Sequence, residues 1–352
     1  MRPATNTVRQ NASLRSLSAY IRPLWAIKIN AMKTQLSILL TIVFLVISCN
    51  NQTKDNRNSY TDENTDNYTG PIIDMHIHAF TEENPMFGMM HPPTLRGETY
   101  EGVTSANEQK EKTFEKFLKH NIVKAMVSNG QLWFDDSPEI VLIGDADKGV
   151  DTLRIQHEEG NLHVIGEMAP FYAGILADDP SILPYFGLAQ ELNIPAAFHI
   201  LPGGPNYGIH LIPEMLGGMR TYNANPLQLE AALIKFPDLK LYIMHGGWPY
   251  IDDVKALMYA HPNLYVDIAV INWILPQEEF NAYIKALINS GFGDRIMFGS
   301  DQMVWPETID VAIETVNSAD FLTLEQKEDI FYNNAANFLG LDEEEIKEHK
   351  SK

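Results

Sequence analysis

Two histidines near residue 76 have the spacing that a metal site on a β-strand requires. His76 and His78 alternate with apolar residues in Pro71-Ile-Ile-Asp-Met-His-Ile-His78, so both imidazoles point to one side of an extended chain. Imidazole is a common ligand of divalent metals. The pair alone is weak evidence, because 11 histidines in 352 residues produce this spacing by chance about 0.3 times.

Other polar side chains end apolar segments farther along the chain. They are Glu167 after Val-Ile-Gly, His199 after Ala-Ala-Phe, His245 after Tyr-Ile-Met, and Asp301 after Phe-Gly-Ser. Buried polar groups need partners, and one metal ion satisfies several of them together. Three histidines instead precede apolar segments and are expected to be structural: His120, His163 and His261.

Eight short apolar segments are predicted to be the strands that position these residues. They are Ile72–His76, Ile122–Val127, Ile140–Ile143, Leu162–Glu167, Ala196–Ile200, Leu239–Met244, Leu264–Ile268 and Arg295–Phe298. Helical spacing of apolar residues predicts helices between them, among them Asn107–His120, Pro226–Phe236 and Gln277–Asn289.

Strands that alternate with helices over about 280 residues predict a single α/β domain, a parallel (β/α)8 TIM barrel. The carboxyl ends of the strands of such a barrel meet at one face, where active sites are built. The long segments Phe80–Ala106 and Leu201–Asn225 follow the first and fifth predicted strands and belong to that face.

With these motifs in this order, the chain resembles the amidohydrolase superfamily, and specifically its amidohydrolase-related (amidohydrolase 2) branch. The resemblance covers about residues 70–341. It rests on Asp74-x-His76-x-His78, His199, His245-Gly-Gly, Gly299-Ser-Asp301 and the ending Ile330–Leu341. It implies His76, His78, His199 and Asp301 as metal ligands. It also implies that His245 either binds a second metal or polarises the substrate. Such ligands suit Zn²⁺, with Mn²⁺, Fe²⁺ or Co²⁺ as alternatives.

Glu167 bears on the number of metals and on the class of reaction. Superfamily members with two metals bridge them with a carboxylated lysine or a glutamate on the fourth strand. The decarboxylases of the related branch typically bind one metal and lack that carboxylate. Glu167 therefore resembles a bridging ligand and favours a hydrolase. The alternatives are a carboxylate that orients a ligand histidine and a capped loop residue.

The resemblance implies a metal-dependent hydrolase that cleaves an amide, lactone or ester of a small molecule. A bound Zn²⁺ lowers the pKa of water to near 7, and Asp301 would act as general acid and base. The first alternative is a decarboxylase, which needs basic groups for its carboxylated substrate; Arg96 and Arg220 are the only arginines in the predicted loops of the active face. The second is a non-catalytic surface lipoprotein, against which the complete set of ligand positions argues.

Further residues are candidates for contact with the ligands or the substrate. Asp74 is expected to contact the ligands or the substrate. Asp267 could line the pocket, and a role in supporting the ligands or the fold is equally expected. His91 and Arg96 in the first long loop could meet a substrate carboxylate, although an ordinary solvated loop is the alternative. The same doubt applies to other residues of this face: Tyr207, His210 and Trp273.

Composition excludes several classes of protein. The chain has 26 basic and 46 acidic residues and a net charge of −20, which is the wrong sign for a general nucleic-acid binder. A single cysteine, Cys49, excludes an intrachain disulfide framework and a cysteine-based zinc site. Whether the chain forms a homo-oligomer is left open.

The first 49 residues are predicted to be an export signal and not part of the fold. They contain basic residues but no acidic ones, and the apolar run Leu36–Ile47 is too short to span a bilayer. Val46-Ile-Ser-Cys49 resembles a bacterial lipobox, which implies lipid on Cys49 and membrane contact through that anchor alone. Residues 1–31 fit no signal, so we expect translation to start at Met32. Residues 50–69 are predicted to be a flexible polar tether and 70–352 the barrel.

Overall fold

The computed structural model describes residues 67–206, 210 and 218–352. The predicted export signal with Cys49, most of the polar tether and Tyr207 lie outside the described residues. In the described part of the chain, no helix combines the length and the apolar character that crossing a membrane demands.

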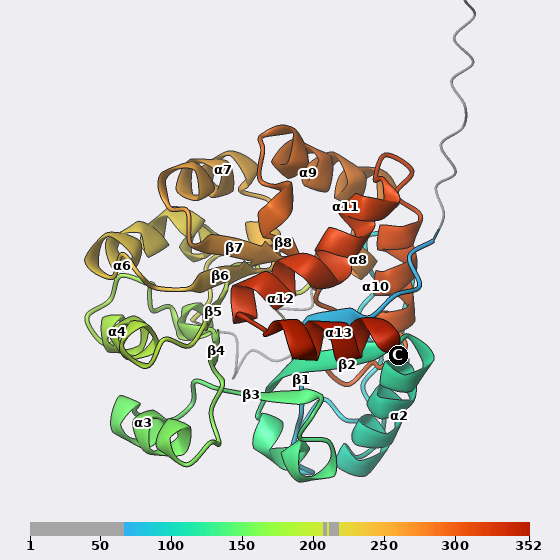
Figure 1. Cartoon of the computed structure of the whole chain (residues 1–352), viewed down its shortest axis with the longest axis horizontal. Coiled ribbons are helices and arrows are strands. Elements are labelled where there is room, and N and C mark those ends of the chain that lie inside the picture. Colours follow the sequence, from blue (N-terminus) through green and yellow to red (C-terminus); the bar gives the residue numbers. More distant parts are fainter. Residues whose placement is uncertain (1–66, 207–209, 211–217) are drawn as a thin grey trace, which may run out of the picture. The chain divides into compact units, whose positions relative to one another are not determined.

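Eight parallel strands form one sheet in sequential order, β1 to β8, which curves into a nearly closed barrel (Figure 1). Their bounds are β1 Ile72–His78, β2 Ile122–Ser128, β3 Val141–Asp145, β4 Val164–Met168, β5 Ala196–His199, β6 Leu241–Met244, β7 Leu264–Asp267 and β8 Ile296–Met297. Backbone hydrogen bonds from Met75 to Phe298 (2.9 Å) and from Asp301 to His76 (2.7 Å) join β1 to the last strand and the loop that follows it.

Helices surround the strands and form the outer layer of the barrel (Figure 1). They are α2 Ala106–Lys119, α3 Val150–Glu158, α4 Leu183–Leu192, α6 Glu230–Lys235, α7 Ile251–Ala260, α8 Ile271–Ile274, α9 Gln277–Asn289, α10 Thr308–Asn317, α11 Leu324–Glu328, α12 Asn334–Leu339 and α13 Glu343–Ser351. Helix α9 shows why these segments are helical: Phe280, Tyr283, Ile284 and Leu287 recur at helical spacing and are buried against the strands.

The (β/α)8 barrel and all eight predicted strands are confirmed, with differences of at most two residues at either end. The helix predicted over Gln277–Asn289 has those bounds, and the one predicted over Asn107–His120 is Ala106–Lys119. The helix predicted over Pro226–Phe236 divides into a 3₁₀ turn, Pro226–Leu229, and α6. Pro226 and the Asn225 side chain, which accepts from the Leu227 N–H, favour this tight start.

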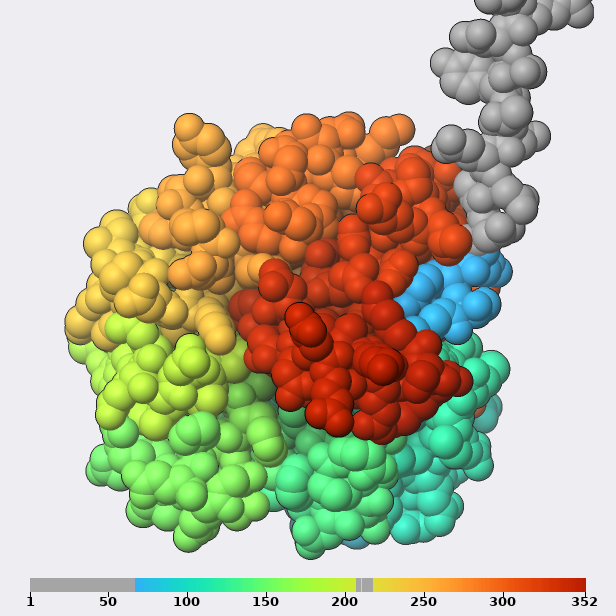
Figure 2. All heavy atoms as spheres, in the orientation of Figure 1, coloured from blue at the N-terminus to red at the C-terminus, as the bar shows by residue number. Residues whose placement is uncertain are grey.

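Apolar side chains fill the barrel and the layer between its strands and helices. Inward side chains such as Ile73, Met126 and Tyr242 pack with Tyr332 and Phe338 of the C-terminal segment. Helices α12 and α13 lie across the end of the barrel that faces the viewer in Figures 1 and 2. This is the end at which the strands begin, so the opposite end, where they finish, is the one that remains for a site.

The predicted structural histidines lie away from that site. His163 Nδ1 accepts from the Ile143 N–H at 3.0 Å. His120 makes a hydrogen bond with Asp310, whose carboxylate also accepts from Lys116 at 2.8 Å and Lys119 at 3.0 Å. These contacts join α2 to α10.

We expect Asp310→Asn to destabilise the fold at pH 7, because it removes the ion pairs with Lys116 and Lys119. The loss should be only about 1 kcal/mol, because these ion pairs are partly exposed to solvent. Partial burial raises the pKa of Asp310, but the bonds from Lys116 and His120 prevail and lower it from 3.8 to about 2. The stabilisation is therefore present above about pH 4 and is lost as the pH falls through 2. Urea unfolding of the wild type and the variant at pH 7 and pH 2.5 measures this stabilisation. An equal difference in the free energy of unfolding at the two pH values would show that the Asp310 carboxylate is not its source.

Candidate metal centre

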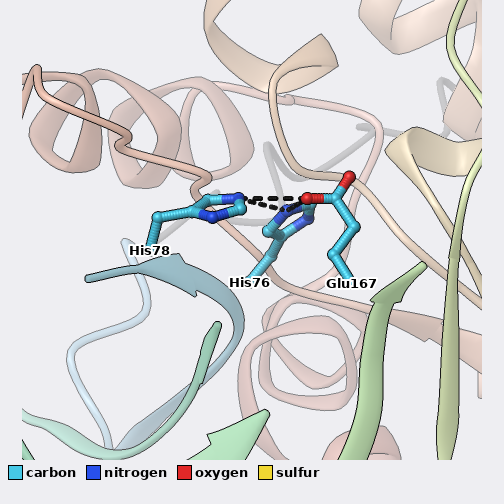
Figure 3. A group of neighbouring side chains, drawn as sticks. All are labelled: His76, His78 and Glu167. Atoms are coloured by element: carbon cyan, nitrogen blue, oxygen red, sulfur yellow. Dashed lines mark hydrogen bonds and ion pairs between the residues drawn. The ribbon is translucent and has the colours of Figure 1, made fainter. Parts of the chain in front are cut away.

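The first strand brings two imidazoles together at the end of the barrel where strands finish. His76 and His78 extend from β1 toward Glu167, which comes from β4 (Figure 3). The Nε2 atoms of the two histidines are 3.3 Å apart, and both side chains are buried. The alternation predicted from the sequence thus places both rings on the inner side of one strand.

The Glu167 carboxylate lies between two pairs of histidines. Its Oε2 is 3.2 Å from His78 Nε2 and 3.6 Å from His76 Nε2. Its Oε1 contacts His199 Nδ1 and is 3.7 Å from His245 Nε2. Each oxygen therefore faces a different pair, which is the arrangement that a carboxylate shared by two cations requires.

Asp301 completes the side of the cluster formed by β1. Its Oδ1 is 3.1 Å from His78 Nε2 and 3.7 Å from His76 Nε2. The same oxygen is buried and has no hydrogen-bond partner of suitable geometry among the described residues. Asp301 has φ 51°, a left-handed conformation that is uncommon outside glycine and tends to occur at functional sites.

His199 and His245 form the other side of the cluster. His245 Nε2 lies 2.9 Å from His199 Nδ1. The remaining nitrogen of each ring faces an oxygen: the Tyr172 hydroxyl is 3.2 Å from His199 Nε2, and the Ala269 carbonyl is 3.2 Å from His245 Nδ1. If those outer nitrogens hold the protons, both inner nitrogens present lone pairs to the space beside Glu167.

Asp267 forms hydrogen bonds with two of these histidines. Its Oδ2 accepts from His76 Nδ1 at 3.2 Å, and its Oδ1 accepts from the backbone N–H of His245 at 2.8 Å. The first bond leaves His76 Nε2 free to act as a ligand. Such outer carboxylates hold the tautomer and the ring orientation of metal-binding histidines.

Asp74 connects the β1 segment to the loop that holds Asp301. Its Oδ1 accepts from the backbone N–H groups of His76 and Ser300, both at 3.0 Å. Burial raises the pKa of this carboxyl to about 7. Gly299 allows the close approach, because a Cβ at this position would lie 2.9 Å from the Cβ of His76.

The charges of the cluster are strongly interdependent. Burial raises the pKa of Glu167, but the facing imidazoles, His199 first, bring it well below its usual range. The pKa of Asp301 is lowered to about 2 in the same way, mainly by His76. Burial lowers the pKa of His78, but the carboxylate of Asp301 prevails and raises it to about 9. The carboxylates thus remain ionised and require positive charge beside them.

Three overlapping groups of side chains could hold a metal ion. In each group the candidate ligand atoms lie within 4.8 Å of one another. The groups are His76, His78 and Glu167; His76, His245 and Asp267; and Glu167, His199 and His245. The donors are imidazole nitrogens and carboxylate oxygens, the set expected for Zn²⁺, Mn²⁺ or Fe²⁺. Together with Asp301 Oδ1, which lies beside His76 and His78, this chemistry fits one or two divalent cations.

The structure does not bring the two candidates from the first long loop into this cluster. Arg96 donates from its Nε to the Leu275 carbonyl and from Nη2 to the Asn272 carbonyl at 2.9 Å, so its guanidinium fastens the loop. His91 is buried between Trp273 and Trp305 at ring distances of 5.0 and 4.7 Å. Burial lowers the pKa of His91 to about 4, so it is neutral at pH 7. Neither residue is placed as a cation for a substrate carboxylate.

Some supporting residues were not found from the sequence. Gln302 accepts from the backbone N–H of His78 at 3.0 Å and donates to its carbonyl at 2.8 Å. Gln109 of α2 donates to the same carbonyl at 2.9 Å. Tyr172, after β4, contacts His199 as described above. Gln302 was detectable only as the neighbour of Asp301, and isolated glutamine and tyrosine residues give no motif.

Two cavities open beside the cluster. One, of about 200 Å³, is lined by His78, Asp145, Asp147 and Glu167 among others. The other, of about 450 Å³, is lined by Glu167, Tyr172, Tyr185 and Asp147 among others. Because Glu167 and Asp147 line both, the two cavities adjoin at the candidate metal centre.

Comparison with known proteins gives one family match. The family model described as Amidohydrolase matches residues 146–341, more than half of the chain. The match begins after β1, so the placement of His76 and His78 in the centre rests on the geometry. A stretch of 137 residues is 20% identical to Protein fluG of Emericella nidulans. It covers 34% of this chain and 16% of that protein, so this chain matches only a small part of that relative.

Solved structures share the fold at low identity. A putative amidohydrolase from Staphylococcus aureus is 14% identical, covering 77% of this chain and 100% of that chain with a TM-score of 0.54. A dihydroxybenzoic acid decarboxylase from Polaromonas sp. JS666, with bound manganese and an inhibitor, is 14% identical, covering 79% and 99% with a TM-score of 0.54. A probable 2-pyrone-4,6-dicarboxylic acid hydrolase from Acinetobacter baumannii is 14% identical, covering 77% and 99% with a TM-score of 0.51.

We expect Asp267→Asn to weaken binding of Zn²⁺ about 10- to 100-fold, because the amide cannot hold His76 with a charge-assisted bond. Competition with a chromophoric chelator measures the affinity. Asp145→Asn is the matched control, since Asp145 is equally buried beside the centre but is not among the candidate ligand groups. Equal affinities in all three proteins would show that Asp267 does not orient a ligand.

Proposed function

The chain belongs to the amidohydrolase family, and from this premise we propose that it is a metal-dependent hydrolase that cleaves the C–N or C–O bond of an amide, lactone or ester. The observation that supports this reaction class is the position of Glu167. Its two oxygens face two pairs of histidines, His76 with His78 and His199 with His245. A carboxylate so placed suits two cations, which is typical of hydrolytic centres.

In this proposal the ligands divide into two sets that share Glu167. His76, His78 and Asp301 would hold one ion, and His199 and His245 the other. The donors are compatible with Zn²⁺, which we favour, and with Mn²⁺, the ion bound in the decarboxylase from Polaromonas. When bound, such cations polarise the scissile carbonyl and lower the pKa of a water molecule toward 7.

Asp301 is the proposed general acid and base. Its Oδ1 is buried 3.1 Å from His78 Nε2, at the edge of the ligand cluster, where it can accept the proton of the attacking water. The same oxygen then returns that proton to the nitrogen or oxygen of the leaving group. Because the pKa of Asp301 is lowered to about 2, its carboxylate is ionised at neutral pH.

The contacts of His245 favour one of the two roles considered for it. The Ala269 carbonyl lies beside Nδ1 and can accept a hydrogen bond from an N–H at that position. Nε2, near Glu167 and His199, then has a lone pair. A lone pair binds a metal but cannot donate a hydrogen bond to a substrate carbonyl. We therefore propose His245 as a metal ligand.

Decarboxylation is the second candidate, because some solved structures of the same fold are decarboxylases. Such a reaction starts from a substrate that carries a carboxylate. Among the described residues that line the two cavities at the centre, no lysine or arginine is present to bind that carboxylate. The cavities also contain two acidic side chains, Asp145 and Asp147, beside the candidate ligands. These charges support the hydrolase.

We expect elemental analysis of the purified full-length protein to find two divalent ions per chain. Glu167→Gln should contain one or none, because an amide bridges cations poorly. Glu82→Gln, which changes an exposed glutamate outside the cavities, should retain two. One ion per chain in all three proteins would remove the bridging role and make the decarboxylase the stronger candidate.

We expect Asp301→Asn to lower kcat roughly 10²- to 10⁴-fold while the fold is retained, because the amide cannot transfer the proton. Asparagine accepts the left-handed conformation of this position, so the backbone need not change. Turnover of a panel of amides, lactones and esters at saturating metal, with thermal unfolding beside it, tests both statements. A stable variant with nearly unchanged kcat would exclude Asp301 as the proton carrier.

A further inference from the structure

The cavities beside the metal centre continue into a single groove. The cavity that contains His78 and Glu167 shares Phe80 and Asn129 with a further cavity of about 370 Å³. At its other side it shares Ala146, Asp147, Glu167 and Ala169 with the cavity of about 450 Å³. The proposed reaction centre thus lies along the middle of an elongated groove formed by loops that follow β1 to β4.

The charges along this groove are mostly negative. Apart from the candidate ligand Glu167, its described lining contains three acidic side chains, Glu83, Asp145 and Asp147, and one basic side chain, Lys148. Lys148 lines only the cavity farthest from the second pair of histidines. The residues of the β5 loop that the structure leaves undescribed, 207–209 and 211–217, contain no lysine or arginine in their sequence.

Asp147 is the acidic residue best placed to meet a ligand. It lines both cavities that adjoin at Glu167, and its side chain is exposed. Within the described ranges, its carboxylate forms no hydrogen bond or ion pair. By contrast, Asp145 is buried and accepts from the Asp147 N–H at 2.9 Å and from Gln156 at 3.3 Å. Asp147 is therefore an exposed carboxylate on the lining of both cavities.

Aromatic residues line the same two cavities as Asp147. Phe80 stacks on His78 with a ring distance of 5.5 Å and borders the groove at one side. Tyr172 and Tyr185 border it at the other. Aromatic faces attract cations, and the attraction adds to that of a nearby carboxylate. A substrate anion away from the metal centre would face no lysine or arginine among the described residues of these two cavities.

We propose that the groove selects positively charged substrates: amides or esters that carry an ammonium or guanidinium group, with Asp147 as its counter-ion. This inference rests on the proposed function, since it assigns the reacting carbonyl to the metal centre. It places the substrate cation in the part of the groove between Asp147 and the tyrosines. It also predicts discrimination against substrates with a carboxylate at the same position.

Three hydroxamates of equal length test the proposal on the full-length, metal-loaded protein. β-Alanine hydroxamate bears an ammonium group, butyrohydroxamate is neutral and succinic monohydroxamate bears a carboxylate. Hydroxamates bind to divalent metals, so each probe anchors at the centre and extends into the groove. Calorimetry at pH 7 and low salt measures Kd for each. We expect the ammonium probe to bind about two- to fivefold more tightly than the neutral one, and the carboxylate probe to bind most weakly.

Variants of Asp147 assign the preference to one side chain. Asp147→Asn should remove most of the ammonium advantage, and Asp147→Lys should favour the carboxylate probe. Asp238→Asn is the matched control: it removes the same charge from an exposed turn before β6, at the other end of the barrel. Unchanged affinity of every variant for butyrohydroxamate would show that the centre itself is intact.

The outcomes separate this inference from the proposed function. Equal affinity for the three probes, or the tightest binding of the carboxylate probe, overturns the charge preference and leaves the hydrolase proposal standing. A preference that persists in Asp147→Asn overturns the role of Asp147. Failure of all three probes to bind the metal-loaded protein overturns both, because the groove would not give access to a metal.

Discussion

The burial of ionised carboxylates among imidazoles at one end of an apolar barrel is the constraint on which the rest of the structure depends. Glu167 and Asp301 are both buried, and an unpaired buried carboxylate is strongly unfavourable. Four imidazoles from the ends of three strands, β1, β5 and β6, offset part of this cost, and divalent cations would offset more. The hydrogen bond from the Asp301 N–H to the His76 carbonyl holds the loop after β8 against β1 and so keeps Asp301 beside His76 and His78.

A second layer of polar residues keeps the first in place. Asp267 contacts both His76 and the backbone of His245, and thereby connects β1, β6 and β7 at one carboxylate. The side chains of Asp74 and Gln302 join β1 to the loop after β8 by hydrogen bonds. Because each of these side chains joins segments distant in sequence, the position of every candidate ligand depends on closure of the whole barrel. The opposite end, covered by α12 and α13, contributes stability without contributing to the centre (Figure 1).

The strands, the barrel and the convergence of the polar strand ends could be predicted from the sequence, because each is a local pattern repeated in order. His199 and His245 interrupt apolar segments, and the barrel alone brings such interruptions to one face. The positions of the loop side chains relative to the centre could not be predicted. The distance from the centre to His91 or Arg96 depends on how the segment between β1 and α2 packs, and it packs against Val304 and Trp305 after β8. Tyr172 and Gln109 belong to no motif, since a single polar side chain shows no spacing.

The residues that would perform the chemistry and the residues that would select the substrate come from different parts of the barrel. The candidate ligands and Asp301 come from strand ends or the residues just after them, whose positions the barrel fixes. The groove is lined by Phe80, Asp147 and Tyr172, which come from segments between strands and α-helices, and by Tyr185 of α4. Loops tolerate change far better than strands do. Relatives of the same fold can therefore keep one kind of metal centre and meet differently charged substrates, so the charge of this groove says more about the substrate than the family does.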